Sequence, residues 1–205
     1  MSHYFENDKS IKSEERIIYA SINKMDFKFL VDNGIFSKKG VDFGTRSLLE
    51  NIIIDTEKNS ILDFGCGYGP IGIYLSKLTN LKVDMIDVNE RAVALARKNA
   101  NLNRVNVNIF ESNLYGSITE TYDYIVTNPP IRVGKEILYK ILFEAKKYLN
   151  HNGELWLVVN KNQGAKTLFN DLKKEYDVEI VAKCKGFYII RAINNWQLVN
   201  YLIKL

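Results

Sequence analysis

The sequence predicts an α/β protein with a doubly wound, mostly parallel sheet of seven strands, an antiparallel C-terminal strand and a small N-terminal β extension. From Ser60 onward, short apolar segments alternate with segments of helical periodicity. Strands that alternate with helices need crossover connections, and these produce parallel strands with helices on both faces of the sheet. Only Lys185-Gly186 separates the last two apolar segments, so these are expected to pair antiparallel.

The N-terminal extension is predicted from two β-prone segments with a turn between them. Residues 16–22 are apolar, and residues 25–31 place an apolar side chain at every second position. Asn23-Lys24 suits a hairpin turn between the two, and Asn33-Gly34 is a turn signal that ends the second strand. The expected units are the extension over residues 1–40, an α/β domain over 41–195 and a C-terminal tail over 196–205.

The elements of the main sheet are expected in chain order. The first strand, Ser60–Phe64, leads through a glycine-rich turn to a helix that begins at Pro70. Further strands are expected over residues 83–86, 105–110, 122–127, 154–159, 178–182 and 187–192. Helices are expected over residues 89–101, 134–149 and 163–176. Before Ser60 the patterns define no further element, although Arg46 is expected to lie on a helix.

The turn after the first strand has the chemistry of a nucleoside-binding loop. Glycines at alternate positions let the main chain turn tightly and let a ligand lie against bare backbone. Pro70 fits the first position of the following helix, whose N-terminus favours an anionic group such as a carboxylate. Asp63, just before the loop, should repel phosphates and attract an ammonium group.

S-adenosylmethionine (SAM) fits this loop better than a dinucleotide does. It carries an ammonium, a carboxylate and a sulfonium but no phosphate, and Pro70 stands where the dinucleotide fingerprint needs its third glycine. Asp87, at the end of the second strand, is expected to accept hydrogen bonds from ribose hydroxyls, or else to cap the next helix. Asn113, after the third strand, is expected near the adenine amino group, or else is an ordinary loop residue. The expected cofactor-binding residues are Asp63, Gly65, Cys66, Gly67, Asp87, Val88, Asn113, Leu114 and Asn128.

Asn128-Pro129-Pro130, at the end of the fourth strand, predicts the chemistry at the reacting end, although in isolation it could be a simple turn. Two prolines fix the main chain and leave only carbonyl acceptors. If the Asn128 side-chain oxygen and the Pro129 carbonyl accept the two hydrogens of an amino group, its nitrogen becomes more tetrahedral and its lone pair can attack a methyl group. Positioning and electrostatics then supply the catalysis. All three residues are therefore predicted to be catalytic.

Composition excludes several other classes. No segment approaches the roughly 20 apolar residues needed to span a bilayer, and the polar N-terminus is not a secretory signal. Two cysteines make neither a disulfide framework nor a zinc cluster, so no metal is expected and a reduced, cytoplasmic protein is predicted. The net charge of +4 favours a nucleic-acid partner only slightly.

Three segments carry a resemblance to a known family: His3-Tyr4-Phe5, residues 36–46, and residues 128–135, with residues 160–165 in addition. The sequence resembles the class I SAM-dependent methyltransferases with a Rossmann-like sheet, and within them the small-subunit rRNA guanine-N2 methyltransferases in their short, single-catalytic-domain bacterial form. The resemblance implies methyl transfer from SAM to guanine N2 of rRNA, with rRNA or a ribosomal subunit as the partner. Residues 41–195 would then be the methyltransferase domain.

The sequence departs from related amino-methyltransferases at one position. Many of them follow the two prolines with an aromatic residue that stacks on the target base, whereas Ile131 provides only apolar contact. Stacking must then come from another residue. Arg132 and Lys135 are expected to contact flanking phosphates, or else to be a solvated helix start. Ile131, Arg132 and Lys135 are thus the expected substrate-binding residues.

Three alternative functions stay open. The same Asn-Pro-Pro chemistry serves methylation of a protein glutamine or of adenine N6, although an aromatic residue usually follows the prolines there. A non-catalytic SAM- and RNA-binding protein would not need Asn128 in addition to Asp63 and Asp87. An NAD-dependent oxidoreductase is disfavoured by Pro70. The oligomeric state does not follow from the sequence.

Overall fold

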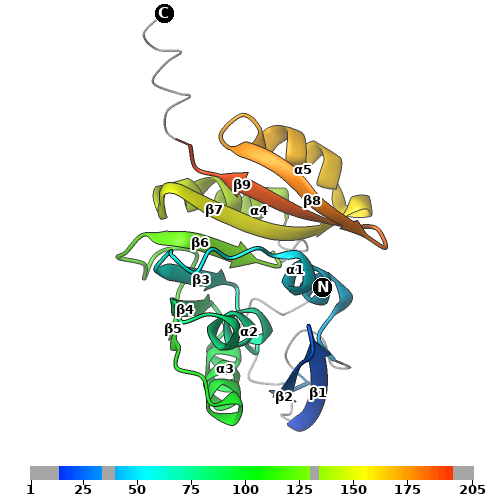
Figure 1. The fold of residues 1–205 in the computed structure, drawn as a ribbon, viewed down its shortest axis with the longest axis vertical. Helices are drawn as coiled ribbons and strands as arrows, with labels where there is room; N and C mark the ends of the chain where they lie inside the picture. Colours follow the sequence, from blue (N-terminus) through cyan, green and yellow to red (C-terminus); the bar gives the residue numbers. More distant parts are fainter. Residues whose placement is uncertain (1–13, 34–39, 130–133, 196–205) are drawn as a thin grey trace, which may run out of the picture.

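The computed structural model describes residues 14–33, 40–129 and 134–195, and these form a large and a small sheet (Figure 1). The order in the large sheet is β5-β4-β3-β6-β7-β9-β8. Strands β3 to β7 are parallel, and β8 and β9 pair antiparallel, as predicted. β9 also pairs antiparallel with β7. The strands are β3 (Ser60–Phe64), β4 (Lys82–Asp87), β5 (Asn108–Glu111), β6 (Tyr122–Thr127), β7 (Leu149–Asn160), β8 (Asp177–Cys184) and β9 (Phe187–Ile193).

Helices cover both faces of this sheet. They are α1 (Phe43–Asn51), α2 (Pro70–Leu78), α3 (Glu90–Asn103), α4 (Lys135–Glu144) and α5 (Ala165–Leu172), with short 3-10 turns η3 (Ala145–Lys147) and η4 (Lys161–Gln163). One core lies against α1, α2 and α3, and a second lies against α4 and α5. Successive residues of β6 serve opposite cores, Val126 the first and Ile125 the second, as the alternation of a strand requires. Within the described ranges, no helix is long and apolar enough to cross a membrane.

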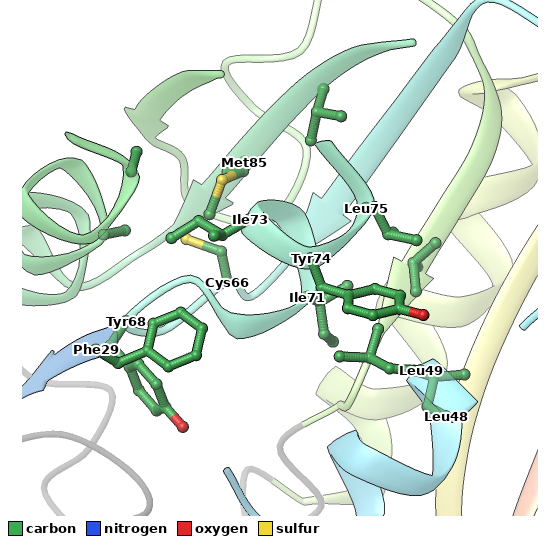
Figure 2. Close-up of a cluster of buried hydrophobic side chains, with 14 of the residues drawn as sticks. Phe29, Leu48, Leu49, Cys66, Tyr68, Ile71, Ile73, Tyr74, Leu75 and Met85 are labelled. Carbon is green, nitrogen blue, oxygen red and sulfur yellow. The ribbon is translucent and has the colours of Figure 1, made fainter. Parts of the chain in front are cut away.

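The small sheet is the predicted hairpin, β1 (Arg16–Ile22) with β2 (Met25–Val31). Asn23 and Lys24 both have positive φ, the conformation that a two-residue turn between twisted strands needs. The hairpin shares the first core: the Phe29 ring meets the ring of Tyr68, in the glycine loop, at 5.5 Å edge to face (Figure 2). Asn99 of α3 accepts from the backbone N–H of Leu30 at 2.6 Å and donates to the Tyr68 carbonyl at 2.8 Å. The hairpin therefore supports the loop that follows β3.

Helix α1 is the element that the sequence patterns do not define as a whole. It is short, and its buried apolar side chains are the adjacent Leu48 and Leu49, which pack in the first core. Asp42 begins it as N-cap, accepting from the backbone N–H of Thr45 at 3.1 Å. A pattern of two adjacent leucines shows no helical period, so only the capping residue signals the helix.

Several predicted boundaries are wrong by a few residues. The strand expected from residue 105 begins at Asn108, because Arg104 ends α3 in a left-handed conformation and Val105 still bonds back to Ala100. The helix expected over 134–149 ends at Glu144, and β7 begins already at Leu149. A bulge opposite Tyr122 and Tyr124 absorbs polar residues 150–153, which mask the alternation of this strand. The helix expected over 163–176 covers only Ala165–Leu172.

Candidate active site

The predicted site residues come from neighbouring strands at one edge of the sheet. β3 lies between β4 and β6, so the residues that follow these parallel strands meet at their carboxyl ends. Open α/β sheets bind ligands at this edge. Helix α1 reaches the same edge, where β6 ends (Figure 1). Asp63, Asp87 and Asn128 are thereby brought into one region.

Asp63 is fully buried beneath the glycine loop. Its Oδ2 accepts from the backbone N–H of Gly72 at 2.8 Å. This approach depends on glycine, since a Cβ on Gly72 would lie 3.0 Å from Oδ2 and 2.6 Å from Met85. Among the described residues, Oδ1 has no hydrogen-bond partner. Burial is the main cause that raises the pKa of Asp63 to about 7, and the charge of Asp87 adds to it.

The glycine loop is tied to the second strand through its backbone. The N–H groups of Gly65 and Cys66 both donate to the carbonyl of Ile86, at 2.9 and 2.8 Å. Gly65 has a φ of 72°, and a Cβ there would meet nothing within 4 Å, so open space lies beside its main chain. Burial, with the charges of Asp63 and Asp87, raises the pKa of the Cys66 thiol. Cys66 is buried and packs in the first core.

Asp87 holds the other side of the loop. Its Oδ2 accepts from the N–H of Gly67 at 2.8 Å, and its Oδ1 accepts from the N–H of Asn89 at 2.9 Å. Asn89 itself is the N-cap of α3, so Asp87 supports the cap instead of forming it. Burial raises the pKa of Asp87 against these hydrogen bonds. Each carboxylate oxygen keeps a further lone pair that is able to accept from a ribose hydroxyl. Ribose binding by Asp87 stays a prediction.

The remaining predicted cofactor residues line the next strand ends. Val88 is half-buried directly after Asp87. Asn113 is exposed in the turn that follows β5, and Leu114 is half-buried with a φ of 51°. The backbone N–H of Ser112 donates to the carbonyl of Asp87 at 3.0 Å, which joins this turn to β4. The contact of Asn113 with adenine stays a prediction.

Asn128 is half-buried and its side-chain amide is oriented by α1. Its Nδ2 donates to Thr45 Oγ1 at 2.9 Å and lies 3.3 and 3.4 Å from the two carboxylate oxygens of Asp42. An ionised carboxylate only accepts hydrogen bonds, so the NH₂ end of the amide must face Asp42. No hydrogen bond within the described ranges uses Asn128 Oδ1. The side chain thus has one end fixed and presents an acceptor at the other.

Asp42 and Thr45 are site residues that the sequence reasoning missed. They precede Asn128 by 86 and 83 residues. Thr45 is buried, and Asp42 serves as helix cap and amide partner at once. The available signal was the aspartate three residues before a threonine at a helix start. It predicts a cap and gives no information about a distant partner.

The predicted substrate residues are described only in part. Pro129 is buried at the end of β6. Pro130, Ile131 and Arg132 lie outside the described residues. Lys135 is the exposed first residue of α4, and its ammonium lies 4.9 Å from the centroid of the Tyr139 ring. Phosphate contact by Lys135 stays a prediction.

The donor and acceptor set suits a cationic nucleoside. Asp63 offers an unpartnered buried oxygen, Asp87 adds a second carboxylate, and the backbone beside Gly65 is open. A positively charged ligand would offset the energetic cost of burying the charges of these two acids. In the described part of the chain, no cluster of three or more His, Cys, Asp or Glu residues could hold a metal ion. These features fit the ammonium and ribose of SAM.

Comparison with known proteins assigns the family. The model of the methyltransferase small domain family matches residues 26–191. The uncharacterized protein YbxB of Bacillus subtilis is 43% identical over 195 residues, which cover 93% of this chain and 97% of that protein. A putative protein N5-glutamine methyltransferase of Methanocaldococcus jannaschii is 33% identical, covering 74% of this chain and 87% of that protein.

Further similarity extends to larger proteins. The ribosomal RNA small subunit methyltransferase C of Psychromonas ingrahamii is 34% identical over 69% of this chain, but the match spans only 42% of that protein. The Thermus thermophilus 16S rRNA N2 G1207 methyltransferase, solved with SAM and guanosine, shares the fold with a TM-score of 0.78 at 22% identity. That match covers 90% of this chain and 52% of the solved one. The chain therefore belongs to the methyltransferase small domain family and is a methyltransferase that uses SAM as methyl donor.

Proposed function

We propose that this enzyme methylates an exocyclic amino nitrogen of a base in RNA, with guanine N2 of small-subunit rRNA as the target. The orientation of Asn128 is the main observation that supports an amino group as the methyl acceptor. Thr45 and Asp42 occupy its NH₂ group, so Oδ1 is the end available to a substrate. An acceptor at this position suits a substrate that brings N–H donors, as an amino group does.

The residues of the chain then act by positioning and electrostatics. Asn128 Oδ1 and the Pro129 carbonyl accept the two hydrogens of the amino group. The nitrogen lone pair, otherwise delocalised into the ring, becomes localised and available for attack. SAM, when bound, would supply the electrophilic methyl group, with the neutral thioether as the leaving group. The nitrogen gains positive charge as the new bond forms, and the two acceptors stabilise that charge before one proton is lost to water.

The cofactor half binds by a different set of groups. Asp63 and Asp87 attract the positive charge of SAM, and Asp87 accepts from its ribose. Gly65, Cys66 and Gly67 let the ligand approach the main chain, with Val88, Asn113 and Leu114 beside the nucleoside. Binding of a cation favours the ionised form of Asp63, whose pKa of about 7 makes this gain in charge available near neutral pH.

RNA as the substrate is supported by the relatives and by charge. Several relatives between 31% and 35% identical are named ribosomal RNA small subunit methyltransferase C. The chain spans less than half of the length of the Psychromonas protein, so the choice of rRNA nucleotide is part of the proposal. The net charge of +4 agrees with a polyanionic partner.

The second candidate is a glutamine side chain in a protein. The Methanocaldococcus relative named as a putative protein N5-glutamine methyltransferase favours it, and a carboxamide brings the same two N–H donors to Asn128. The test is mass mapping of rRNA from cells that lack the protein. Loss of a single N2-methylguanine, restored by the wild-type gene and not by Asn128→Ala, supports the RNA target. An unchanged rRNA profile refutes it and favours the glutamine candidate.

A further inference from the structure

Three segments far apart in the sequence meet beside α1 and form what we call the aromatic–lysine surface: Phe43, Phe187, Lys185 and Lys161. Phe43 is 40% exposed, and its ring centroid lies 5.8 Å from that of Phe187. The ammonium of Lys185 lies 5.4 Å from the Phe43 centroid. Lys161 runs along the β8–β9 turn, with its backbone N–H donating to the Gly186 carbonyl at 2.7 Å.

This surface adjoins the group that orients Asn128. A Cβ built on Gly44 would lie 3.0 Å from Cε1 of Phe187 and 3.1 Å from Oδ1 of Asp42. The Phe187 ring and the Asp42 carboxylate are thus separated by little more than the Gly44 backbone. Asp42 in turn lies against the Asn128 amide. A ligand on the aromatic–lysine surface is therefore next to the reacting end of the site.

The charge at this part of the sheet edge is positive. Residues 155–170 and 180–195 contain lysines and no aspartate or glutamate, and they supply the ends of β7 and β8, the start of β9 and all of η4. The ion pairs formed among the described residues do not include Lys161, Lys183 or Lys185. Asp42 lies close to this surface, and its carboxylate faces Asn128 and the Thr45 backbone. The lysines remain available to an anionic partner.

We propose that the aromatic–lysine surface binds the RNA strand beside the target nucleotide. Phe43 stacks on an unpaired base next to the target, and Lys185 moves from the Phe43 ring to a phosphate of the same strand, with Lys161 contacting a neighbouring phosphate. The contact between Lys185 and the Phe43 ring is then replaced by a ring–base contact and a cation–phosphate contact. Single-stranded RNA is bound by this combination of aromatic rings and lysines. The surface thus provides an aromatic contact to the base beside the target, which is a different base from the one that Ile131 is expected to contact.

The inference rests on the proposed function, and its test separates the two. RNA affinity is measured by fluorescence anisotropy with a short single-stranded RNA of mixed sequence, over a series of salt concentrations. Phe43→Ala should weaken binding roughly fivefold to a hundredfold, with Phe43→Trp restoring it. Lys185→Glu should weaken binding and lower the slope of log affinity against log salt by about one. SAM affinity, measured by calorimetry, should not change in either variant.

Lys173→Glu is the matched control. Lys173 also lies over an aromatic ring, 4.9 Å from the centroid of half-buried Phe169, but it follows the last residue of α5, away from the site. This variant should bind RNA as the wild type does. Wild-type affinity in Phe43→Ala and Lys185→Glu, or an equal loss in Lys173→Glu, would overturn the proposed surface. Wild-type protein that binds RNA through Phe43 yet methylates no RNA would leave the surface standing and overturn the proposed function.

Discussion

The cofactor half of the site, which is Asp63, the glycine loop and Asp87, is held together by contacts between residues close in sequence. The target half, which is Asn128 with Asp42 and Thr45, is held together by contacts between residues far apart in sequence. In the cofactor half, Asp63 bonds to an amide nine residues later, and Asp87 to amides 20 residues earlier and two residues later. In the target half, Asn128 is held by side chains 83 and 86 residues earlier. The first is a network of carboxylates with backbone N–H groups, and the second is a network of side chains.

Because of this difference, we expect that a substitution can change SAM affinity or the rate of transfer separately. The buried carboxylates of the cofactor half shape the loop itself, so a change there alters ligand affinity. The side chains of the target half orient one amide and leave the loop untouched, so a change there alters the rate of transfer. Each of the following substitutions tests this separation.

The largest effect is expected from Asn128→Ala. It removes the oriented acceptor without touching the glycine loop, so kcat should fall about a hundredfold to a thousandfold. SAM affinity by calorimetry should stay within about twofold, because affinity resides in the other half. Asn108→Ala, an exposed asparagine at the start of β5, is the control and should keep full activity. An equal loss of SAM affinity and rate would mean that Asn128 is structural.

The opposite pattern is expected from Asp87→Ala. It removes the proposed ribose acceptor together with the anchor of Gly67, so SAM affinity should fall about tenfold to a hundredfold. Transfer at saturating SAM should be largely retained. Titration calorimetry and initial rates at high SAM separate the two effects, with exposed Asp26→Ala as control. SAM affinity equal to that of the wild type would refute the role of Asp87.

A dependence on pH is expected from Asp63. Its pKa of about 7 lies above the ordinary 3.8, so the folded protein keeps this proton where the unfolded chain has lost it. Without ligand, Asp63 therefore lowers the free energy of unfolding as the pH rises from about 4 to about 7. Cationic SAM favours the ionised form, so its affinity should rise about tenfold from pH 6 to pH 7.5.

The matched variant for this pH dependence is Asp63→Asn, which can still accept from Gly72. It should bind SAM weakly and lose the part of the pH dependence near pH 7. Titration of SAM itself is common to both proteins, and so is that of Asp87, whose pKa is also raised by burial. The same pH profile in both proteins would exclude Asp63 as the titrating group.

The smallest effect is expected from Gly44→Ala. The new Cβ would press on Phe187 and on Asp42 at 3.0 and 3.1 Å, so one of the two must shift by a few tenths of an ångström. A displaced Asp42 reorients Asn128, and kcat should fall several-fold with SAM affinity unchanged. Gly116→Ala, in the turn after β5, would press on the carbonyl of Asn113 at 3.1 Å, in the cofactor half, so it should alter SAM affinity and leave kcat at saturating SAM largely unchanged. Unchanged kcat in Gly44→Ala would show that Phe187 moves instead.

The same difference in range explains how much the sequence predicted. Ser60–Phe64 and Tyr122–Thr127 were predicted with their observed bounds, because buried parallel strands are short apolar runs between turn signals. The glycine loop and Asp87 were predicted because their chemistry lies within one strand–loop–helix unit. That reasoning requires no knowledge of distant contacts.

The target half could be predicted only in part. Asn128 stands out beside its prolines, but the partners that orient it lie at the start of α1, which the sequence patterns do not define as a helix. Which side chains meet across 86 residues is decided by packing of α1 against β7 and β9, and a local pattern carries no record of it. The start of β7 was not predicted for the same reason. Residues 150–153 interrupt the apolar alternation, and only the pairing with β6 shows that the strand already begins before them.

We infer that Asp42 affects the reaction through Asn128, and a double-mutant cycle on kcat measures this dependence. Asp42→Ser keeps an N-cap for α1 but is too short to reach the Asn128 amide. Alone, it should lower kcat about tenfold. In the Asn128→Ala background, single-turnover rates should show no further loss, because the group that Asp42 orients is gone. Losses in kcat that multiply, with melting temperatures unchanged, would show that Asp42 acts independently of Asn128.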